Sequence, residues 1–300
     1  MPLMLFSLIG NVSSVASTRP ISRDPTWHQA LPPNVSLLHR SQRACSIDPL
    51  QIPGRGTAVN DLEILEALKQ VDSPTITNVV ATYPGAKTCL GLYNPWTENW
   101  YTDQTIKCMY PEMGPRVGYA VTCVFGLPDP NFKGRLSFLD VVDALDASPR
   151  PTILVLEQKF PPEIAGKVGL AGEIMTTTMK AMGCVGCISN GPSRDIDAIR
   201  ALDFQYMLTG VSAGHGEFAV QSVNAPVSVG GMDVAPGEII HMDENGAVKF
   251  PADKLAAVHE NVKTLLEGEE AQLSRLRNAS SAEEVRAIMT GGTYSPKDKK

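Results

Sequence analysis

Two short segments of this chain carry residues that could bind a small anion. The first, Gly172-Glu173-Ile174-Met175, has the pattern of a helix start, which offers unpaired backbone N–H groups to an anion. The second is a turn over 190–193 that leads into Arg194 and Asp195. A guanidinium supplies donors for substrate oxygens, and an adjacent carboxylate is a hard ligand for a divalent cation. Together these groups indicate a site for a small keto acid.

The length and composition of the chain indicate that the helices and strands that position these residues belong to a globular protein. With 300 residues, 43% apolar and 19% charged, the chain can bury a substantial core. Its net charge of -6, its pI near 5.4 and the lack of a Lys/Arg cluster argue against a nucleic-acid surface. The apolar run at 3–9 is far shorter than the roughly 20 residues that cross a bilayer. We therefore expect a soluble protein that binds neither nucleic acid nor membrane.

The first 47 residues differ from the rest, because they hold four arginines, one acidic residue (Asp24) and many Ser and Pro residues. This composition fits an organellar transit peptide and equally a disordered extension. We place residues 1–55 outside the fold, 56–255 in one catalytic domain, and 256–300 in a helical arm with a disordered tail at 297–300. The expected location is the cytoplasm, or the mitochondrion if the extension is a transit peptide.

Apolar periodicity beyond residue 60 predicts alternating helices and strands. The expected helices cover 61–68, 73–80, 139–145, 173–182 and 196–202, and the expected strands cover 117–125, 152–156, 184–189 and 205–209. Such alternation is typical of a layered α/β core. Four short strands with glycine turns between 226 and 251 predict a β-meander that closes the domain, and a helix over 252–276 predicts a half-exposed arm.

The six cysteines are scattered, which favours free thiols in a reducing compartment. Cys184 and Cys187 have the spacing of a redox or zinc pair, but both lie in an expected buried strand. Residues three apart on a strand point to opposite faces, so we expect their sulfurs not to converge. Both are interpreted as core thiols.

Several segments resemble the RraA-like family, which includes the class II 4-hydroxy-4-methyl-2-oxoglutarate and 4-carboxy-4-hydroxy-2-oxoadipate aldolases. The aldolases carry an acidic residue, twenty positions and then Arg-Asp; here 194 − 173 − 1 = 20 positions separate Glu173 from Arg194. The likeness covers 60–251 and is strongest from 170 onward. The segments that carry it are 116–122, 171–174, 190–195, 229–231, 234–238 and 243–248.

The resemblance implies an α/β fold of the swivelling β/β/α sandwich type, here with an N-terminal extension and a C-terminal helix. It also implies homotrimers or homohexamers with active sites at subunit interfaces. The implied activity is that of a metal-dependent lyase, an aldolase that cleaves 4-hydroxy-2-oxo acids to pyruvate, with oxaloacetate decarboxylation as a related activity. By likeness, substrate would contact Gly172, Glu173, Ile174, Met175 and Arg194, and Asp195 would hold magnesium or manganese.

Elementary chemistry agrees with these implied roles. In both reactions negative charge builds on the former keto oxygen of a pyruvate enolate, which Arg194 and the metal would stabilise. Removal of one such preorganised donor costs about 3 kcal/mol, roughly a hundredfold in rate. We interpret Glu173 as orienting the water that carries a proton to or from the substrate. Several aldolases have Asp at this position, and the added methylene could move the carboxylate by about 1 Å.

Structural explanations compete with these functional ones. Arg194 and Asp195 could form only a helix cap and a surface ion pair. We interpret His215 as a turn residue, His241 as structural, and Glu157 as a supporting residue at the carboxyl end of a strand. The aromatic segment 92–101 could be a lid, a partner surface or packing; packing is favoured, because loop Trp and Tyr residues often cover a core edge.

Two other functions stay open at this point. A metal-dependent hydratase or lyase on another 2-oxo acid would use the same enolate chemistry. Some members of the family lack the acidic spacing and act as protein-binding regulators of a ribonuclease complex. This chain keeps Arg194 and Asp195, which favours an enzyme, although its acidity also permits a basic partner.

Overall fold

A computed structural model describes residues 59–83, 86–131 and 136–290, all within one unit of the chain, Asp48–Lys300. The extension predicted over 1–55 and the tail at 297–300 lie outside the described residues. Among the described helices, none has the length and apolar composition needed to cross a bilayer. The helices are α1 (Val59–Leu68), α2 (Ser73–Val80), α3 (Phe138–Ala147), α4 (Pro162–Ala165), α5 (Glu173–Ala181), α6 (Ile196–Ala201), α7 (Leu255–Arg277) and α8 (Ala282–Met289), with short 3-10 turns at Pro111–Met113 and Ala252–Lys254.

The main sheet joins a parallel centre to antiparallel edges. Its order is β1-β5-β4-β3-β2-β9-β10, in which β2 to β5 run parallel, and β6 also pairs with β2. β2 is long enough to pair antiparallel with β9 near its start and with β6 near its end. The strands are β1 (Lys107–Cys108), β2 (Arg116–Gly126), β3 (Thr152–Lys159), β4 (Cys184–Ser189), β5 (Gln205–Leu208), β6 (Ala219–Val223), β9 (Ile239–Asp243) and β10 (Gly246–Phe250).

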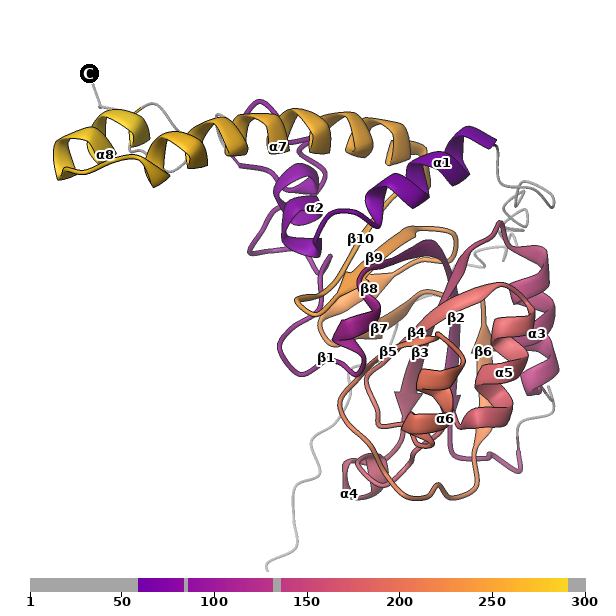
Figure 1. Cartoon of the computed structure of the whole chain (residues 1–300). Helices are drawn as coiled ribbons and strands as arrows, with labels where there is room; N and C mark the ends of the chain where they lie inside the picture. Colours follow the sequence, from indigo (N-terminus) through magenta and orange to yellow (C-terminus); the bar gives the residue numbers. More distant parts are fainter. Residues whose placement is uncertain (1–58, 84–85, 132–135, 291–300) are drawn as a thin grey trace, which may run out of the picture. The chain divides into compact units, whose positions relative to one another are not determined.

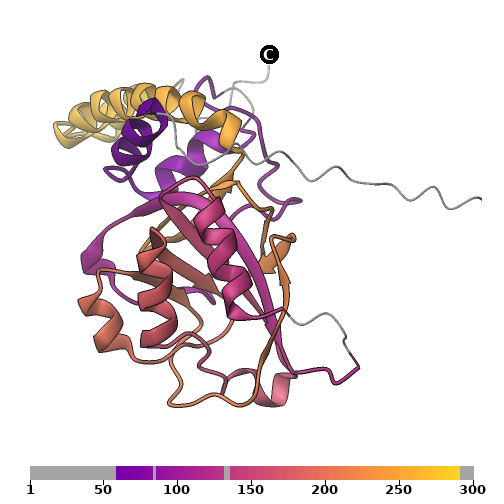
Figure 2. The ribbon, with the colours of Figure 1, turned by 90° about the vertical axis from the view of Figure 1, so that its right-hand side faces the viewer.

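The two faces of this sheet are covered differently, which confirms the predicted β/β/α layering. Helices α3, α5 and α6 cover one face of the parallel strands (Figures 1 and 2). The opposite face packs against the separate two-stranded sheet of β7 (Val227–Val229) and β8 (Met232–Val234). Along β2, Val121 and Cys123 face the helices while Ala120 and Val124 face β7 and β8, as the period of a strand requires. A third cluster joins α1, α2 and the first part of α7 to β9 and β10 (Figure 1).

Local capping explains where two of the predicted helices begin. At α2, Asp72 Oδ1 accepts a hydrogen bond from Thr75 N at 2.9 Å, and Pro74 occupies the first turn. At α3, Asp140 Oδ2 accepts from Ser137 N at 2.6 Å while the Ser137 hydroxyl accepts from Leu139 N, which completes a capping box. The predicted helices and parallel strands are all present, with boundaries shifted by a few residues.

The predicted β-meander over 226–251 is wrong in its pairing. β7 and β8 pair only with each other, around the Gly230-Gly231 turn, whose φ angles are 55° and 77°. β9 instead pairs with the distant strand β2, and β10 pairs with β9. The strands themselves were predicted correctly, but short alternating segments do not specify which neighbour they choose.

The expectation that Cys184 and Cys187 point to opposite faces is also wrong. The register between β3 and β4 shifts after the Thr152–Cys184 pair, so one extra residue enters β4. Both thiols therefore lie in the core beneath α3 and α5, together with Cys123. Burial raises the pKa of Cys184 to about 11. The interpretation as free core thiols is confirmed.

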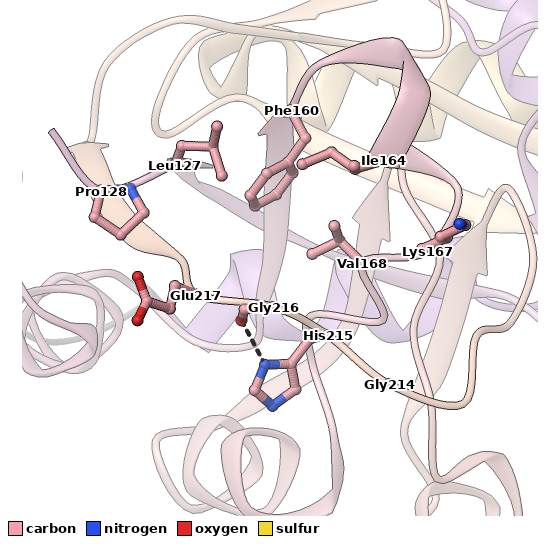
Figure 3. Close-up of a pocket in the computed structure, with 10 residues that line it drawn as sticks. All are labelled: Leu127, Pro128, Phe160, Ile164, Lys167, Val168, Gly214, His215, Gly216 and Glu217. Atoms are coloured by element: carbon pink, nitrogen blue, oxygen red, sulfur yellow. Dashed lines mark hydrogen bonds between the residues drawn. The ribbon is translucent and has the colours of Figure 1, made fainter.

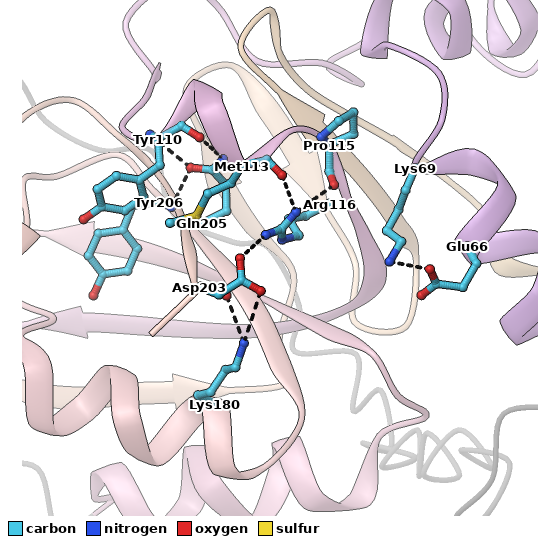
Figure 4. Close-up of polar contacts among 10 residues, drawn as sticks. All are labelled: Glu66, Lys69, Tyr110, Met113, Pro115, Arg116, Lys180, Asp203, Gln205 and Tyr206. Atoms are coloured by element: carbon cyan, nitrogen blue, oxygen red, sulfur yellow. Dashed lines mark hydrogen bonds and ion pairs between the residues drawn. The ribbon is translucent and has the colours of Figure 1, made fainter. Parts of the chain in front are cut away.

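A polar cluster fixes the end of α5 that lies opposite its start (Figure 4). Asp203, just before β5, pairs with Arg116 at 2.5 Å and with Lys180 at 3.9 Å, and its backbone oxygen accepts from Lys180 Nζ at 2.9 Å. Two residues further along the chain, Gln205 Nε2 donates to Tyr110 O at 2.8 Å within the core. The last turn of α5 is thereby tied to the starts of β2 and β5.

Candidate functional site

The start of α5 and the turn before α6 meet at one point. Asp195 Oδ2 accepts a hydrogen bond from Glu173 N, the first amide of α5, at 3.0 Å. Asp195 stands at the cap position of α6 but makes no side-chain bond to that helix. Its backbone is left-handed, with φ 58° and ψ 36°, a conformation that Asp and Asn adopt more readily than most residues. The competing explanation, in which Asp195 only caps its own helix, is therefore wrong, because the carboxylate is directed to the neighbouring helix.

Gly172 allows this close approach. A Cβ atom at this position would lie 2.5 Å from Asp195 Oδ2 and 2.8 Å from Arg194 Nε. Any side chain would have to displace one of these two groups, since real Cβ contacts are longer. We call Gly172, Glu173, Arg194 and Asp195 the anion site, because they combine helix-start amides, a guanidinium and a carboxylate.

Arg194 holds a donor that the described residues leave without a partner. Its Nε atom is buried and makes no hydrogen bond within the described part of the chain, and it lies 3.6 Å from Asp195 Oδ2. The side chain as a whole is 35% exposed, so the rest of the guanidinium can reach a ligand. A buried unpaired donor costs about 1–3 kcal/mol, a cost that a ligand or water oxygen would remove. The geometry thus fits an oxyanion beside Arg194.

A buried polar network holds the chain segment that leads into the anion site. Tyr206 OH donates to Ala171 O at 3.0 Å, and Ser193 Oγ donates to the same carbonyl. Thr176 Oγ1 donates to Gly172 O at 2.9 Å. Burial raises the pKa of Tyr206 well above its usual value, so its hydroxyl keeps the proton that it donates. These bonds fix the backbone immediately before the first turn of α5.

Gln158, near the end of β3, holds the turn that carries Arg194. Its Nε2 atom donates to Ser189 Oγ at 3.2 Å and to Pro192 O at 3.1 Å, and its backbone N donates to Asn190 Oδ1 at 2.6 Å. Gly191 lies against it, since a Cβ there would come within 2.5 Å of three Gln158 side-chain atoms. Sequence reasoning missed Gln158; its position at the carboxyl end of a parallel strand was the available signal.

The donor set at Asp195 fits a metal that is held mainly by water and substrate. Oδ2 is engaged by Glu173 N, while Oδ1 accepts no hydrogen bond from the described residues, and the side chain is 41% exposed. Within the described ranges, no group of three or more His, Cys, Asp or Glu residues could hold a metal ion. Mg²⁺ commonly keeps several waters and one or two carboxylates, so a single ligand such as Asp195 is compatible with it.

The other predicted residues lie in different surroundings. Ile174 is 85% exposed at the start of α5, and Met175 packs against the core under the helices. Glu157 lies within β3, not after it; its contacts are Lys159 at 3.4 Å and Ser228 N at 3.4 Å, on the face toward β7. The prediction that Glu157 supports the anion site is therefore not borne out by its contacts.

The two histidines and the aromatic segment also have defined places. His215 lies in an exposed turn, with Nδ1 2.8 Å from Gly216 O, and His241 is wholly buried with backbone and hydroxyl partners. In the aromatic segment, Trp100 is 1% exposed and stacks on Tyr93, which agrees with packing. Trp96 differs from them, because it is 89% exposed.

A pocket of about 520 Å³ opens where β2 and β3 end (Figure 3). No single motif predicts this pocket, because its residues come from three separate segments of the chain. They are Leu127, Pro128, Phe160, Ile164, Lys167, Val168, Gly214, His215, Gly216 and Glu217. The pocket lies at the strand ends where α/β proteins usually bind ligands.

The chain is similar in sequence to one protein family and to several known proteins. A family model described as RraA-like, Aldolase/RraA, matches residues 94–249, which is more than half of the chain. Protein DlpA of Legionella pneumophila is 25% identical over 161 residues, 52% of this chain and 25% of DlpA. A protein of Halalkalibacterium halodurans, provisionally named a 4-hydroxy-4-methyl-2-oxoglutarate aldolase, is 29% identical over 104 residues, 34% of this chain and 50% of that protein.

A solved structure shows the same fold. Streptomyces coelicolor RraAS2, described as an unusual member of the RNase ES inhibitor RraA protein family, has a TM-score of 0.55 at 20% identity. The match covers 71% of this chain and 96% of RraAS2. The two curated relatives match over only a quarter to a half of their own lengths.

Proposed function

Because the chain belongs to the RraA-like family, we propose that it is a metal-dependent carbon–carbon lyase that cleaves 4-hydroxy-2-oxo acids of the 4-hydroxy-4-methyl-2-oxoglutarate type to pyruvate. The observation that carries this proposal is the meeting of the Glu173 amide, the unpaired Arg194 Nε and the Asp195 carboxylate at Gly172. Oxaloacetate decarboxylation is proposed as a related activity, since it also yields pyruvate through an enolate.

Substrate binding uses the Arg194 guanidinium and those amides in the first turn of α5 that Asp195 does not engage. The amides at the start of α5 carry partial positive charge toward the pyruvyl carboxylate. The Arg194 guanidinium donates to the keto oxygen, and Asp195 would hold Mg²⁺ or Mn²⁺ beside it. The bound cation would supply positive charge near the oxygen on which charge develops.

Cleavage then needs proton transfer at two places. As the C3–C4 bond breaks, its electron pair passes into the pyruvate enolate, the C4 hydroxyl loses its proton and C4 becomes a carbonyl carbon. Arg194 stabilises the enolate oxygen, and protonation of C3 gives pyruvate. Glu173 is exposed at the start of α5, where it can orient the water that transfers these protons.

Exposure at the anion site supports a site shared between subunits. The Ile174 side chain next to Glu173 is 85% exposed, and Val211, beside Ser193, is 53% exposed. In an assembly of the trimer or hexamer type, a neighbouring protomer would cover these apolar groups and exclude water from Arg194 and Asp195. Charge stabilisation increases as water is excluded.

The proposal is tested by pyruvate release from 4-hydroxy-4-methyl-2-oxoglutarate and from oxaloacetate. We expect turnover with Mg²⁺ or Mn²⁺, its loss on chelation and its recovery when metal is added back. Asp195→Asn should abolish Mg²⁺-dependent turnover with the fold intact, because Asn tolerates the left-handed backbone and can still accept from Glu173 N. Asp197→Asn, two residues away and 92% exposed, is the matched control.

Several outcomes would change the assignment. Full activity in Asp195→Asn would contradict the metal-ligand role. Absence of pyruvate from every 4-hydroxy-2-oxo acid and from oxaloacetate would contradict the aldolase proposal, and turnover of a 2-oxo acid without release of pyruvate would then identify a hydratase or other lyase. Binding to a ribonuclease complex without any turnover would instead favour the regulator function.

A further inference from the structure

The pocket at the ends of β2 and β3 has an apolar middle and charged ends. Figure 3 shows Glu217 and Lys167 at opposite sides, with apolar side chains between them. His215 closes the lower side, where its ring packs on Phe218 at 5.2 Å between centroids. Five apolar side chains form the walls: Leu127, Pro128, Phe160, Ile164 and Val168.

Backbone contacts at Gly169 link the loop beside this pocket to the turn that carries the anion site. A Cβ at Gly169 would lie 3.1 Å from Gly214 O, which borders the pocket, and 3.2 Å from Ser193 O, which precedes Arg194. Gly169 N also donates to Gly214 O at 2.8 Å, and Ser212 N donates to Ser193 O at 2.8 Å. The loop that borders the pocket and the turn that carries Arg194 are therefore in direct backbone contact.

The apolar side chains that line the pocket determine which chemical groups can bind in it. A carboxylate among Leu127, Phe160 and Val168 would lose its hydration and find no donor in these side chains, which is unfavourable. An alkyl or aryl group would instead replace water against apolar surface, which is favourable. Glu217 at one end disfavours an anion, and Lys167 lies at the opposite end, away from the apolar middle.

We propose that this pocket receives the substituent on C4 of the substrate, and that the substrate class is 4-hydroxy-2-oxo acids with an apolar C4 group in place of a second carboxylate. This inference rests on the lyase function proposed above; it keeps the cleavage of C3–C4 to pyruvate and changes the preferred substrate from the dicarboxylate to an analogue with an apolar C4 group. Cleavage would break C3–C4, give pyruvate from the enolate, and release an apolar aldehyde or ketone from C4 as its hydroxyl proton leaves. No oxidant or reductant is required.

Matched substrates test the proposal directly. The assay compares two substrates, the aldol adduct of pyruvate and 3-methylbutanal and the dicarboxylate 4-hydroxy-4-methyl-2-oxoglutarate. We expect kcat/KM to be at least roughly tenfold higher for the apolar adduct. Ile164→Lys, at a position already 36% exposed, should lower turnover of the apolar adduct and raise that of the dicarboxylate. Leu139→Lys, 69% exposed on α3 and outside the pocket, is the control and should change neither.

A second measurement does not depend on turnover. Methyl NMR titration with 4-methylpentanoate should shift the signals of Leu127, Ile164 and Val168, while glutarate should not, and Ile164→Lys should abolish the shifts. Absence of shifts with 4-methylpentanoate would overturn the proposal. Equal turnover of both adducts, unchanged by Ile164→Lys, would also overturn it while leaving the lyase function standing. Shifts without pyruvate from any adduct would support the apolar selectivity of the pocket and contradict the lyase function.

Discussion

The anion site and a second polar cluster near α2 each contain an aspartate, but the polar groups of the two clusters are paired to different extents. We call Ser73, His241 and Asp243 the buried histidine network. His241 is 0% exposed; its Nε2 atom lies 3.0 Å from Leu68 O and 3.1 Å from Val71 O, and its Nδ1 atom lies 2.9 Å from Ser73 Oγ. Asp243, also 0% exposed, accepts from Ser73 N at 2.6 Å.

The two clusters differ in whether their polar groups have hydrogen-bond partners and in their backbone conformation. In the buried histidine network both imidazole nitrogens have partners, so nothing is left to bind a ligand. In the anion site, Arg194 Nε is buried without a partner and Asp195 has a left-handed backbone. Unsatisfied donors and unusual backbone conformations collect where ligands bind, while satisfied buried networks specify the fold. The comparison assigns function to the first cluster and stability to the second.

The largest expected effect comes from Arg194→Met. Loss of a donor aimed at the enolate oxygen should lower kcat/KM by about 10² to 10³, or about 3–4 kcal/mol of transition-state stabilisation. The melting temperature should stay close to that of the wild type, because the guanidinium makes no hydrogen bond within the described residues other than its ion pair with Asp195. Steady-state kinetics and thermal melts measure the two quantities.

Arg200→Met is the control for this variant. Arg200 is also half-exposed and paired with acidic groups, but it lies on α6 against Glu112 and Asp197. A similar loss of activity in both variants would show that charge in general, and not the anion site, is responsible.

The next effect concerns stability, and it should appear in His241→Ala. The substitution leaves a cavity and removes the hydrogen-bond partners of Ser73 and two backbone carbonyls. We expect the free energy of unfolding to fall by about 2–3 kcal/mol. At a temperature where the variant is still folded, kcat should match that of the wild type. Urea titration and kinetics on the same sample would separate these outcomes, and a selective loss of kcat would break the comparison.

The smallest effect is the pH dependence of folding. Burial lowers the pKa of His241 below its ordinary value, so the folded state holds the imidazole neutral. The stabilising contribution is present above the unfolded-state pKa of about 6.5 and is lost as pH falls toward the lower folded-state pKa. We expect the free energy of unfolding to decrease on acidification from about pH 7 to pH 5, with a shallower slope in His241→Gln. Identical slopes in the two proteins would contradict the neutral state of His241.

Much of the fold was predictable because its patterns are local. β2 is buried along almost its whole length and α2 begins at a capping Asp and a proline, so their elements follow from composition and spacing. The partner of β9 and the bulge that turns Cys184 toward Cys187 were not predictable. Both features depend on how a strand pairs with a neighbour that is distant in the sequence. The residues of one short segment do not specify that pairing.

The anion site was predictable in its residues but not in its geometry. The spacing of Glu173 and Arg194 identifies the segments, and the structure brings them into contact. Asp195 accepts a hydrogen bond from the first amide of α5 and not from its own helix. This contact depends on how the two helices are arranged in the fold. Gln158 and the apolar pocket come from segments with no distinctive motif, so only the fold reveals them.

Binding of oxalate, a planar mimic of the pyruvate enolate, tests the central claim most directly. Calorimetric titration of oxalate into the full chain, in the presence of Mg²⁺, should show saturable binding of oxalate. Its affinity should fall at least roughly tenfold in Arg194→Met and in Asp195→Asn, while Asp197→Asn should bind oxalate as the wild type does. Binding that is unchanged in Arg194→Met and Asp195→Asn, or no binding to the wild type, would contradict the account.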